Sequence, residues 1–391
     1  MTQRTAALPT SYSVIIAVSS THLINDLIQF LLPALYPVLK TQYALSYFQL
    51  GLLTLAQQIT ACILQPVLGL YGDLRPKPYS LAVSLSIVAI GVIMLATAGS
   101  FTGLLLASAA LGLGSALFHP EASRVCRMAS GGRLGFAQSS FQVGGNLGTA
   151  FGPLAAALII LPLGQFSTIW FSLLAVVGVI LLLWVARWFT HHMRTVQASA
   201  APIIGPNLPR KRLILAFAVL GALLLSKFVY IETFKAYYIF FLIEKFGIGI
   251  PHAQGLLFVF LAAVAVGTFM GGPVGDRIGR KKVIWVSIVG ALPFALVLPH
   301  TPLWAAVALS IIVGLVLSSA FSAIVVYAQE LMPQKVGMVA GFVFGFAFGI
   351  GALGAAALGA LADIIGMQQV FVYLSFLLCL GFLTVTLPDL D

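Results

Sequence analysis

The feature that most constrains this chain is a series of twelve long apolar runs. Six runs lie in the first half and six in the second, with a polar stretch at 191–211 between the two sets. They cover about 13–38, 48–71, 79–98, 102–122, 136–160, 166–189, 213–242, 253–272, 282–299, 303–328, 337–360 and 368–387. A helix needs about 20 mainly apolar residues to cross a bilayer, whereas lipid-facing barrel strands alternate in polarity over about ten. We therefore predict an all-α membrane protein with twelve transmembrane helices.

Composition supports the same conclusion. Apolar residues make up 60% of the 391 and charged residues only 8%, whereas soluble domains carry about 25% charged residues. This balance excludes a soluble enzyme, a disordered chain and a nucleic-acid-binding module. The three cysteines, Cys62, Cys126 and Cys379, are far apart and form no C-x-x-C pair. We therefore expect neither disulfides, a metal site nor a cofactor.

The distribution of basic residues explains the net charge of +10. If the N-terminus is cytoplasmic, sixteen of the 20 Lys and Arg residues lie in cytoplasmic segments. Only Lys40 and Lys245 lie in outer loops, and Lys227 and Lys235 lie inside the seventh run. Cytoplasmic loops of membrane proteins carry an excess of Lys and Arg. We therefore expect both termini in the cytoplasm.

The two halves resemble each other in sequence. Gly69–Asp73 follows the second run, Gly272–Asp276 follows the eighth, and each opens a basic loop. We therefore predict two six-helix bundles related by a pseudo-twofold axis, 1–190 and 212–391, joined by a cytoplasmic linker at 191–211. In transporters with such repeats, substrate sites form near the bilayer midplane between the halves.

The loop sequence Gly272–Lys282 resembles the G-x-x-x-D-R-x-G-R-K motif of the major facilitator superfamily. The resemblance covers the whole chain and implies that family's fold. It also implies a gating role for Asp73, Asp276, Arg277 and Arg280, which would latch the halves in the outward-facing state. In such a latch the acid meets the positive N-terminal end of a neighbouring helix.

Four shorter segments resemble the fosmidomycin-resistance type of drug exporter within that superfamily. They are His22–Asp26, Ala116–Arg124, Phe141–Asn146 and Tyr327–Pro333. The resemblance implies a proton-driven antiporter that expels phosphonate antibiotics such as fosmidomycin and fosfomycin across a bacterial inner membrane. The alternative is a transporter of an endogenous anionic phosphorylated metabolite or sugar.

One departure from drug/proton antiporters concerns the fourth run. Those exporters carry R-x-x-x-G there, and this chain has Ser108 four residues before Gly112. Another ionisable group must then couple the proton. In the fifth run, Ala155 and Ala156 stand where the antiporter pattern has glycines.

Asp26 is the first candidate for proton coupling. It lies thirteen residues into its run, roughly 20 Å deep at about 1.5 Å per residue. His22 is four residues earlier and shares its helix face. Charged groups inside a span are costly and mark functional sites. The alternative is a static hydrogen bond between two helices.

Lys227 occupies the equivalent place in the second half and is the first candidate for binding an anionic drug. An ammonium group is a compact phosphate-binding charge. The alternative is a permanent pair with Asp26. Tyr230 and Tyr237 follow on the same run as possible substrate contacts or packing residues. Glu232 and Lys235 are three apart and can neutralise each other.

A second set of ionisable residues lies towards the cytoplasmic end of the fourth run. His119 and Glu121 are candidates for passing protons to the cytoplasm, and Arg124 for binding the phosphonate. The alternative is a salt bridge that gates the cytoplasmic ends, a role we also assign to Glu330. Gln142 and Asn146 in the fifth run either contact the drug or bridge helices.

Other functional classes find no support in the sequence. Neither H-E-x-x-H nor G-x-S-x-G occurs, so we expect no enzyme, and the absence of G-x-x-x-x-G-K-[ST] argues against an ATP pump. A channel would not need latch loops. The expected partners are a small anionic drug, protons and membrane lipid, with no nucleic acid, and we expect a monomer.

Overall fold

Most of the chain that the structure describes is helical. The structure is a computed structural model, and it describes residues 9–45, 47–197, 206 and 208–390, none of them in a strand. Over the described residues, 1–204 with 332–345 form one compact unit and 205–331 with 346–391 form the other. We call them unit 1 and unit 2.

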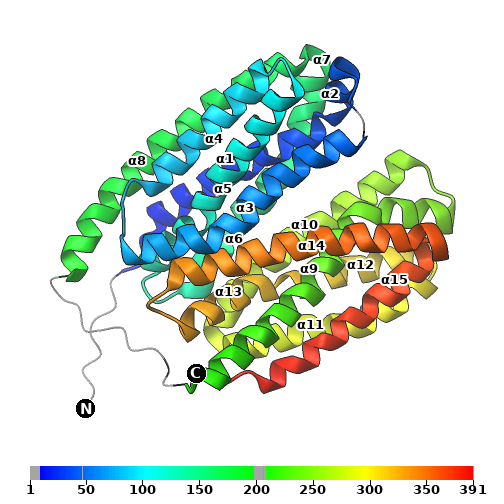
Figure 1. Cartoon of the computed structure of the whole chain (residues 1–391). Helices are drawn as coiled ribbons and strands as arrows, with labels where there is room; N and C mark the ends of the chain where they lie inside the picture. The colour runs from blue at the N-terminus through cyan, green and yellow to red at the C-terminus, as the bar shows by residue number, and fades with distance from the viewer. Residues whose placement is uncertain (1–8, 46, 198–205, 207, 391) are drawn as a thin grey trace. The chain divides into compact units, whose positions relative to one another are not determined.

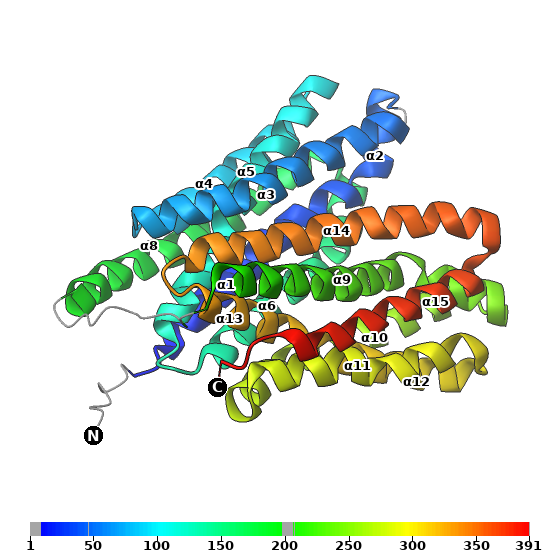
Figure 2. The same cartoon turned by 60° about the horizontal axis from the view of Figure 1, so that its bottom comes forward.

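Unit 1 is made of long helices joined by several short ones (Figure 1). Its elements are α1 (Tyr12–Ala34), α2 (Tyr36–Tyr43), α3 (Tyr47–Leu74), α4 (Ser80–Thr97), α5 (Phe101–Ala129), α6 (Leu134–Ala155), η1 (Ala156–Ile160), α7 (Leu161–Leu163), η2 (Gln165–Ile169) and α8 (Trp170–Gln197). Within it, α5 packs between α3 and α4 (Figure 2).

Unit 2 has the same all-helical composition. Its elements are α9 (Arg210–Phe246), α10 (Ile250–Ile278), α11 (Arg280–Val297), η3 (Leu298–His300), α12 (Leu303–Ser318), α13 (Ala320–Leu331), α14 (Val336–Ile365), α15 (Met367–Phe376) and η4 (Leu377–Thr386). Helix α14 is divided, since its residues up to Gly345 belong to unit 1.

Eleven helical segments of the described chain are long and apolar enough to cross a membrane. Several of these segments are built from two pieces: for example, α12 and α13 form one segment, and α15 continues into the 3-10 helix η4. The fifth predicted span corresponds to α6 followed by η1, and α6 contains Gln138, Gln142 and Asn146. Unit 1 therefore carries three amide side chains within one span.

Close packing of α6 on α1 depends on glycine. A Cβ atom on Gly144 would lie 2.1 Å from the carbonyl oxygen of Ser19, and one on Gly148 would lie 2.3 Å from that of Leu23. Small residues let transmembrane helices approach to backbone contact. The two helices therefore meet tightly along the face that carries His22 and Asp26.

The structure describes only part of the predicted linker at 191–211. Helix α8 continues to Gln197 and α9 begins at Arg210, so helix occupies both ends of 191–211. Residues 198–205 and 207 of this segment lie outside the described residues. The division into bundles at 1–190 and 212–391 stays a prediction.

Candidate functional site

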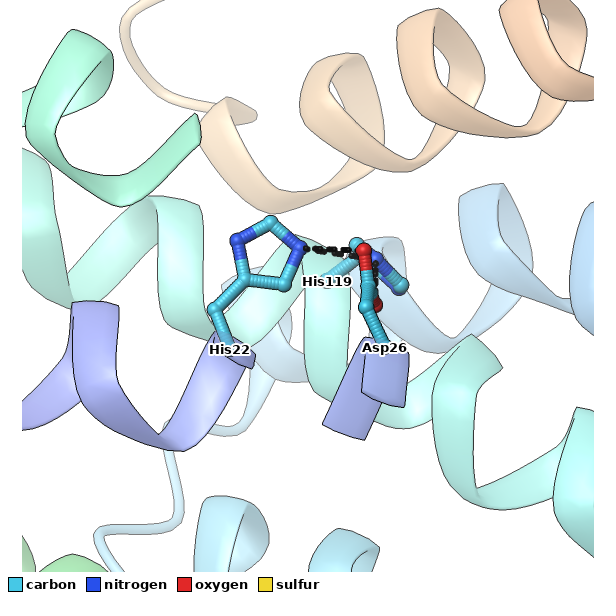
Figure 3. Close-up of side chains that lie close together, drawn as sticks. All are labelled: His22, Asp26 and His119. Atoms are coloured by element: carbon cyan, nitrogen blue, oxygen red, sulfur yellow. Dashed lines mark hydrogen bonds and ion pairs between the residues drawn. The ribbon is translucent and has the colours of Figure 1, made fainter. Parts of the chain in front are cut away.

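Three buried ionisable side chains meet in unit 1 (Figure 3). His22 and Asp26 lie one turn apart on α1, and His119 comes from α5. The Nε2 atom of His22 is 3.3 Å from Oδ2 of Asp26, and Nε2 of His119 is 3.5 Å from Oδ1. The two Nε2 atoms are 3.2 Å apart. We call these three residues the His–Asp cluster.

The hydrogen bonds around the cluster determine where its lone pairs point. The Nδ1 atom of His22 lies 2.7 Å from the carbonyl oxygen of Phe141, and Nδ1 of His119 lies 3.0 Å from that of Ser115. Because a carbonyl oxygen only accepts, each Nδ1 donates, and each neutral imidazole has its lone pair on Nε2. Both lone pairs face the Asp26 carboxylate. The arrangement favours a proton or another cation at the centre.

Aromatic side chains enclose the cluster. The His22 ring stacks on Phe141 with centroids 3.9 Å apart, and His119 lies against Phe344 at 5.4 Å. The amide nitrogen of Asn25 donates to Oδ1 of Asp26 over 2.9 Å. The surroundings are apolar, so electrostatic interactions inside the cluster are strong.

Lys227 is the buried cation of unit 2. Its side chain lies on α9, and Nζ donates to the carbonyl oxygen of Ser318 over 3.4 Å. The same ammonium lies 5.1 Å from the ring centroid of Phe228 and 4.7 Å from that of Phe321. Among the described residues of its own unit, no carboxylate lies within ion-pair distance. An aromatic-lined ammonium without a bound carboxylate can attract an anion.

The pair predicted on the fourth span is present. Arg124 bonds to the carboxylate of Glu121, donates to the carbonyl oxygen of Gly72 over 2.7 Å and lies over the ring of Phe189. The guanidinium group therefore ties α5 to the end of α3. This geometry fits the gating alternative for Arg124 better than a guanidinium group that is free to bind the drug.

A sequence profile described as Major Facilitator Superfamily matches residues 18–243 and 223–390, nearly the whole chain. The chain belongs to the major facilitator superfamily. It is therefore a membrane transporter rather than an enzyme, as predicted.

Two relatives of this superfamily chain span almost its full length. It is 50% identical over 382 residues to the fosmidomycin resistance protein of Escherichia coli K12, covering 97% of this chain and 94% of the relative. It is 39% identical over 383 residues to the uncharacterized transporter YfnC of Bacillus subtilis 168, with the same coverage. The predicted relationship to fosmidomycin-resistance exporters is confirmed, and drug export is the activity that the first relative supports.

Solved structures of the superfamily share the fold. The transporter FucP in its outward conformation matches with a TM-score of 0.72 and 14% identity, covering 96% of this chain and 98% of that one. The human organic anion transporter MFSD10 gives a TM-score of 0.72 and 16% identity, covering 96% and 100%. The predicted twelve-helix superfamily fold is confirmed.

The acid of each copy of the superfamily loop motif accepts hydrogen bonds. In unit 1, the Asp73 carboxylate accepts hydrogen bonds from the amides of Gly337 and Met338, each over 2.8 Å, in the first turn of α14. In unit 2, Arg280 bonds to Asp276 over 3.0 Å and lies 3.4 Å from Glu330. The exposed Arg277 side chain follows Asp276. The gating roles themselves stay predictions.

The remaining predicted residues are spread over both units. Tyr230 is buried and stacks with Phe234, so it lies in the aromatic core of unit 2. Half-buried Tyr237 lies against Gly359 of α14. Gln142 is buried with its Oε1 unpaired among the described residues, and Asn146 is half-buried. Their roles as substrate contacts stay predictions.

Sequence reasoning missed the groups that orient the cluster. Ser115 and Phe141 act through backbone carbonyl oxygens, which any residue type supplies. Asn25 acts through its side chain, and the sequence could have indicated it, because it is a polar residue next to Asp26 in the middle of an apolar run. Nothing in the sequence distinguishes Phe344 from the other apolar residues of its glycine-rich run.

Proposed function

We propose that this chain exports small anionic phosphonate antibiotics, of the fosmidomycin and fosfomycin kind, in exchange for protons. The observation that carries the proposal is the 50% identity to the fosmidomycin resistance protein over nearly all of both chains. Export proceeds by alternating access across the bacterial inner membrane. The protein works as a monomer with both termini in the cytoplasm.

The coupled proton binds at the His–Asp cluster. Two Nε2 lone pairs and the Asp26 carboxylate converge there, so one proton relieves their mutual repulsion. When the proton leaves, the repulsion returns, and the two states of the cluster differ by a full charge. Glu121 lies two residues beyond His119 and is the next acceptor towards the cytoplasm.

The anionic drug binds at Lys227. The ammonium is buried near two phenyl rings, and no carboxylate among the described residues of its unit lies within ion-pair distance. A phosphonate group would supply the missing negative charge. Tyr237 is proposed as a polar contact within unit 2, and Gln142 and Asn146 within unit 1. Arg124 and Tyr230 already have partners, and we assign them to gating and packing.

The decisive experiment measures drug resistance in a bacterial strain without its own exporter. Cells expressing this chain should tolerate more fosmidomycin and fosfomycin, and unrelated cationic drugs should be unaffected. Dissipating the proton gradient should stop export. Asp26→Asn and Lys227→Ala should each abolish resistance at normal membrane levels, whereas Asp389→Asn and Lys282→Ala, both at exposed positions, should keep it.

Four outcomes would contradict the proposal. Protection confined to cationic drugs would rule out an anionic site. Continued drug flux after collapse of the gradient would indicate a channel. Full resistance in both Asp26→Asn and Lys227→Ala would remove the proposed centres, and failure to protect against either phosphonate would favour an endogenous anionic metabolite or sugar.

A further inference from the structure

The two histidine nitrogens and the Asp26 carboxylate of the His–Asp cluster are separated by distances close to the edge of a coordination tetrahedron. Bonds of about 2.0–2.1 Å from a tetrahedral zinc ion place neighbouring ligand atoms about 3.3 Å apart. The two Nε2 atoms are 3.2 Å apart, and each faces its own oxygen of the Asp26 carboxylate, His22 at 3.3 Å from Oδ2 and His119 at 3.5 Å from Oδ1. All three ligand atoms lie within 4.8 Å of one another. The geometry points to a site for a divalent transition metal ion of the zinc type, held by His22, His119 and Asp26.

The groups behind the ligands are those that a metal site requires. A metal-binding histidine donates its second ring nitrogen to a carbonyl or carboxylate, which keeps the lone pair on the ligating atom. His22 does so to Phe141 and His119 does so to Ser115. The carboxylate is held in turn by Asn25. The site is therefore already oriented for binding, and little ordering cost remains.

The donor set selects the class of metal. Imidazole nitrogen suits Zn²⁺, Co²⁺, Ni²⁺ and Cu²⁺, whereas Mg²⁺ and Ca²⁺ prefer sites made of oxygen atoms. Burial adds to the preference, because His22 and His119 are only 2% and 3% exposed and Asp26 is 9% exposed. A dication there neutralises the carboxylate and satisfies both lone pairs. Three protein ligands leave one tetrahedral position for a water molecule.

The sequence predicted no metal site because the ligands are not close in the chain. His22 and Asp26 are four residues apart, but His119 follows 97 residues later. Packing of α5 beside α1 brings it to the other two (Figure 3). One consequence rests on the proposed function: a bound Zn²⁺ occupies the atoms that take the proton, so Zn²⁺ inhibits export.

The test measures metal binding to the purified full chain in detergent, after chelation and without an affinity tag. Co²⁺ is the probe, because tetrahedral Co²⁺ absorbs visible light far more strongly than octahedral Co²⁺. We expect one Co²⁺ per chain with an intense tetrahedral spectrum, which an equivalent of Zn²⁺ removes. His22→Ala, His119→Ala and Asp26→Asn should each weaken binding by about 100-fold or more.

Matched variants separate this site from other histidines. His252→Ala and His300→Ala remove exposed imidazoles and should leave binding unchanged. His119→Cys keeps a ligand and should restore binding with a thiolate-to-cobalt absorption band. Such a band appears only if residue 119 touches the metal, so it also excludes a folding defect as the cause of lost binding.

The proposal is overturned if the wild-type chain shows only an octahedral spectrum. It is also overturned if the His22→Ala and His119→Ala variants bind Co²⁺ as the wild type does, or if the His119→Cys band is missing in a chain that elutes as a single folded species. Transport enters none of these measurements. If proton-coupled export fails, the metal-binding result is therefore unaffected. If metal binding fails, the result for export is likewise unaffected.

Discussion

Gly145 of α6 lies directly against the two α1 members of the His–Asp cluster. A Cβ atom there would lie 2.5 Å from Cε1 and 2.6 Å from Nε2 of His22, and 2.8 Å from Oδ2 of Asp26. No side-chain carbon fits at such distances, so Gly145→Ala must push the imidazole and the carboxylate apart. Overpacking of this kind costs about 1–3 kcal/mol.

We therefore expect Gly145→Ala to reach the membrane but to lose most of its phosphonate resistance. The measurement is the minimum inhibitory concentration, normalised to the amount of protein in the membrane. Gly51→Ala is the matched control, because nothing lies within 4 Å of the Cβ position at Gly51 and resistance should be kept. Full resistance in Gly145→Ala would show that the cluster tolerates displacement.

At the scale of elements, the Asp73 carboxylate caps the start of α14. Gly337 and Met338 are the second and third residues of that helix, and their amides have no acceptor inside it. Removing such a cap costs about 1 kcal/mol. Asp73→Ala should therefore speed amide hydrogen exchange in the first turn of α14 by about fivefold, as measured by mass spectrometry.

The second motif copy provides the control for this cap. Asp276 bonds to the Arg280 side chain, whereas the amides at the start of α14 donate to Asp73, so Asp276→Ala should leave exchange at 336–339 unchanged. Asp73→Asn keeps one accepting oxygen and should give an intermediate rate. Equal exchange in Asp73→Ala and the wild type would mean that the first turn of α14 does not depend on this carboxylate.

The helical elements were largely predictable from the sequence, and their meeting points were not. Long apolar runs lead to spanning helices because lipid offers no partner to a backbone amide. His22 beside Asp26 followed from helical spacing. By contrast, the approach of His119 depends on how α1, α5 and α6 pack, which periodicity does not specify. The loop motif likewise does not show by its sequence that Asp73 accepts from the amides of α14 or that Asp276 accepts from Arg280.

At the scale of the whole molecule, the distribution of basic residues predicts which loops face the cytoplasm. Lys and Arg are retained on the cytoplasmic side during insertion, and the sixteen-to-two count places the loops after odd-numbered spans outside. Gln42 and His300 are exposed residues of predicted outer loops, and Arg75 and Lys282 are exposed residues of predicted inner loops. In a variant whose three native cysteines are replaced, a single new cysteine can be introduced at each of these four positions in turn.

We expect Gln42→Cys and His300→Cys to react with a membrane-impermeant maleimide in intact cells. Arg75→Cys and Lys282→Cys should react only after the membrane is opened, and each variant should confer resistance so that a folded protein is being labelled. Positions 42 and 75 lie in the first half and positions 282 and 300 in the second, so each half is tested separately. The reverse pattern would invert the topology and place the Glu121–Arg124 end of α5 outside, where it would not release protons to the cytoplasm.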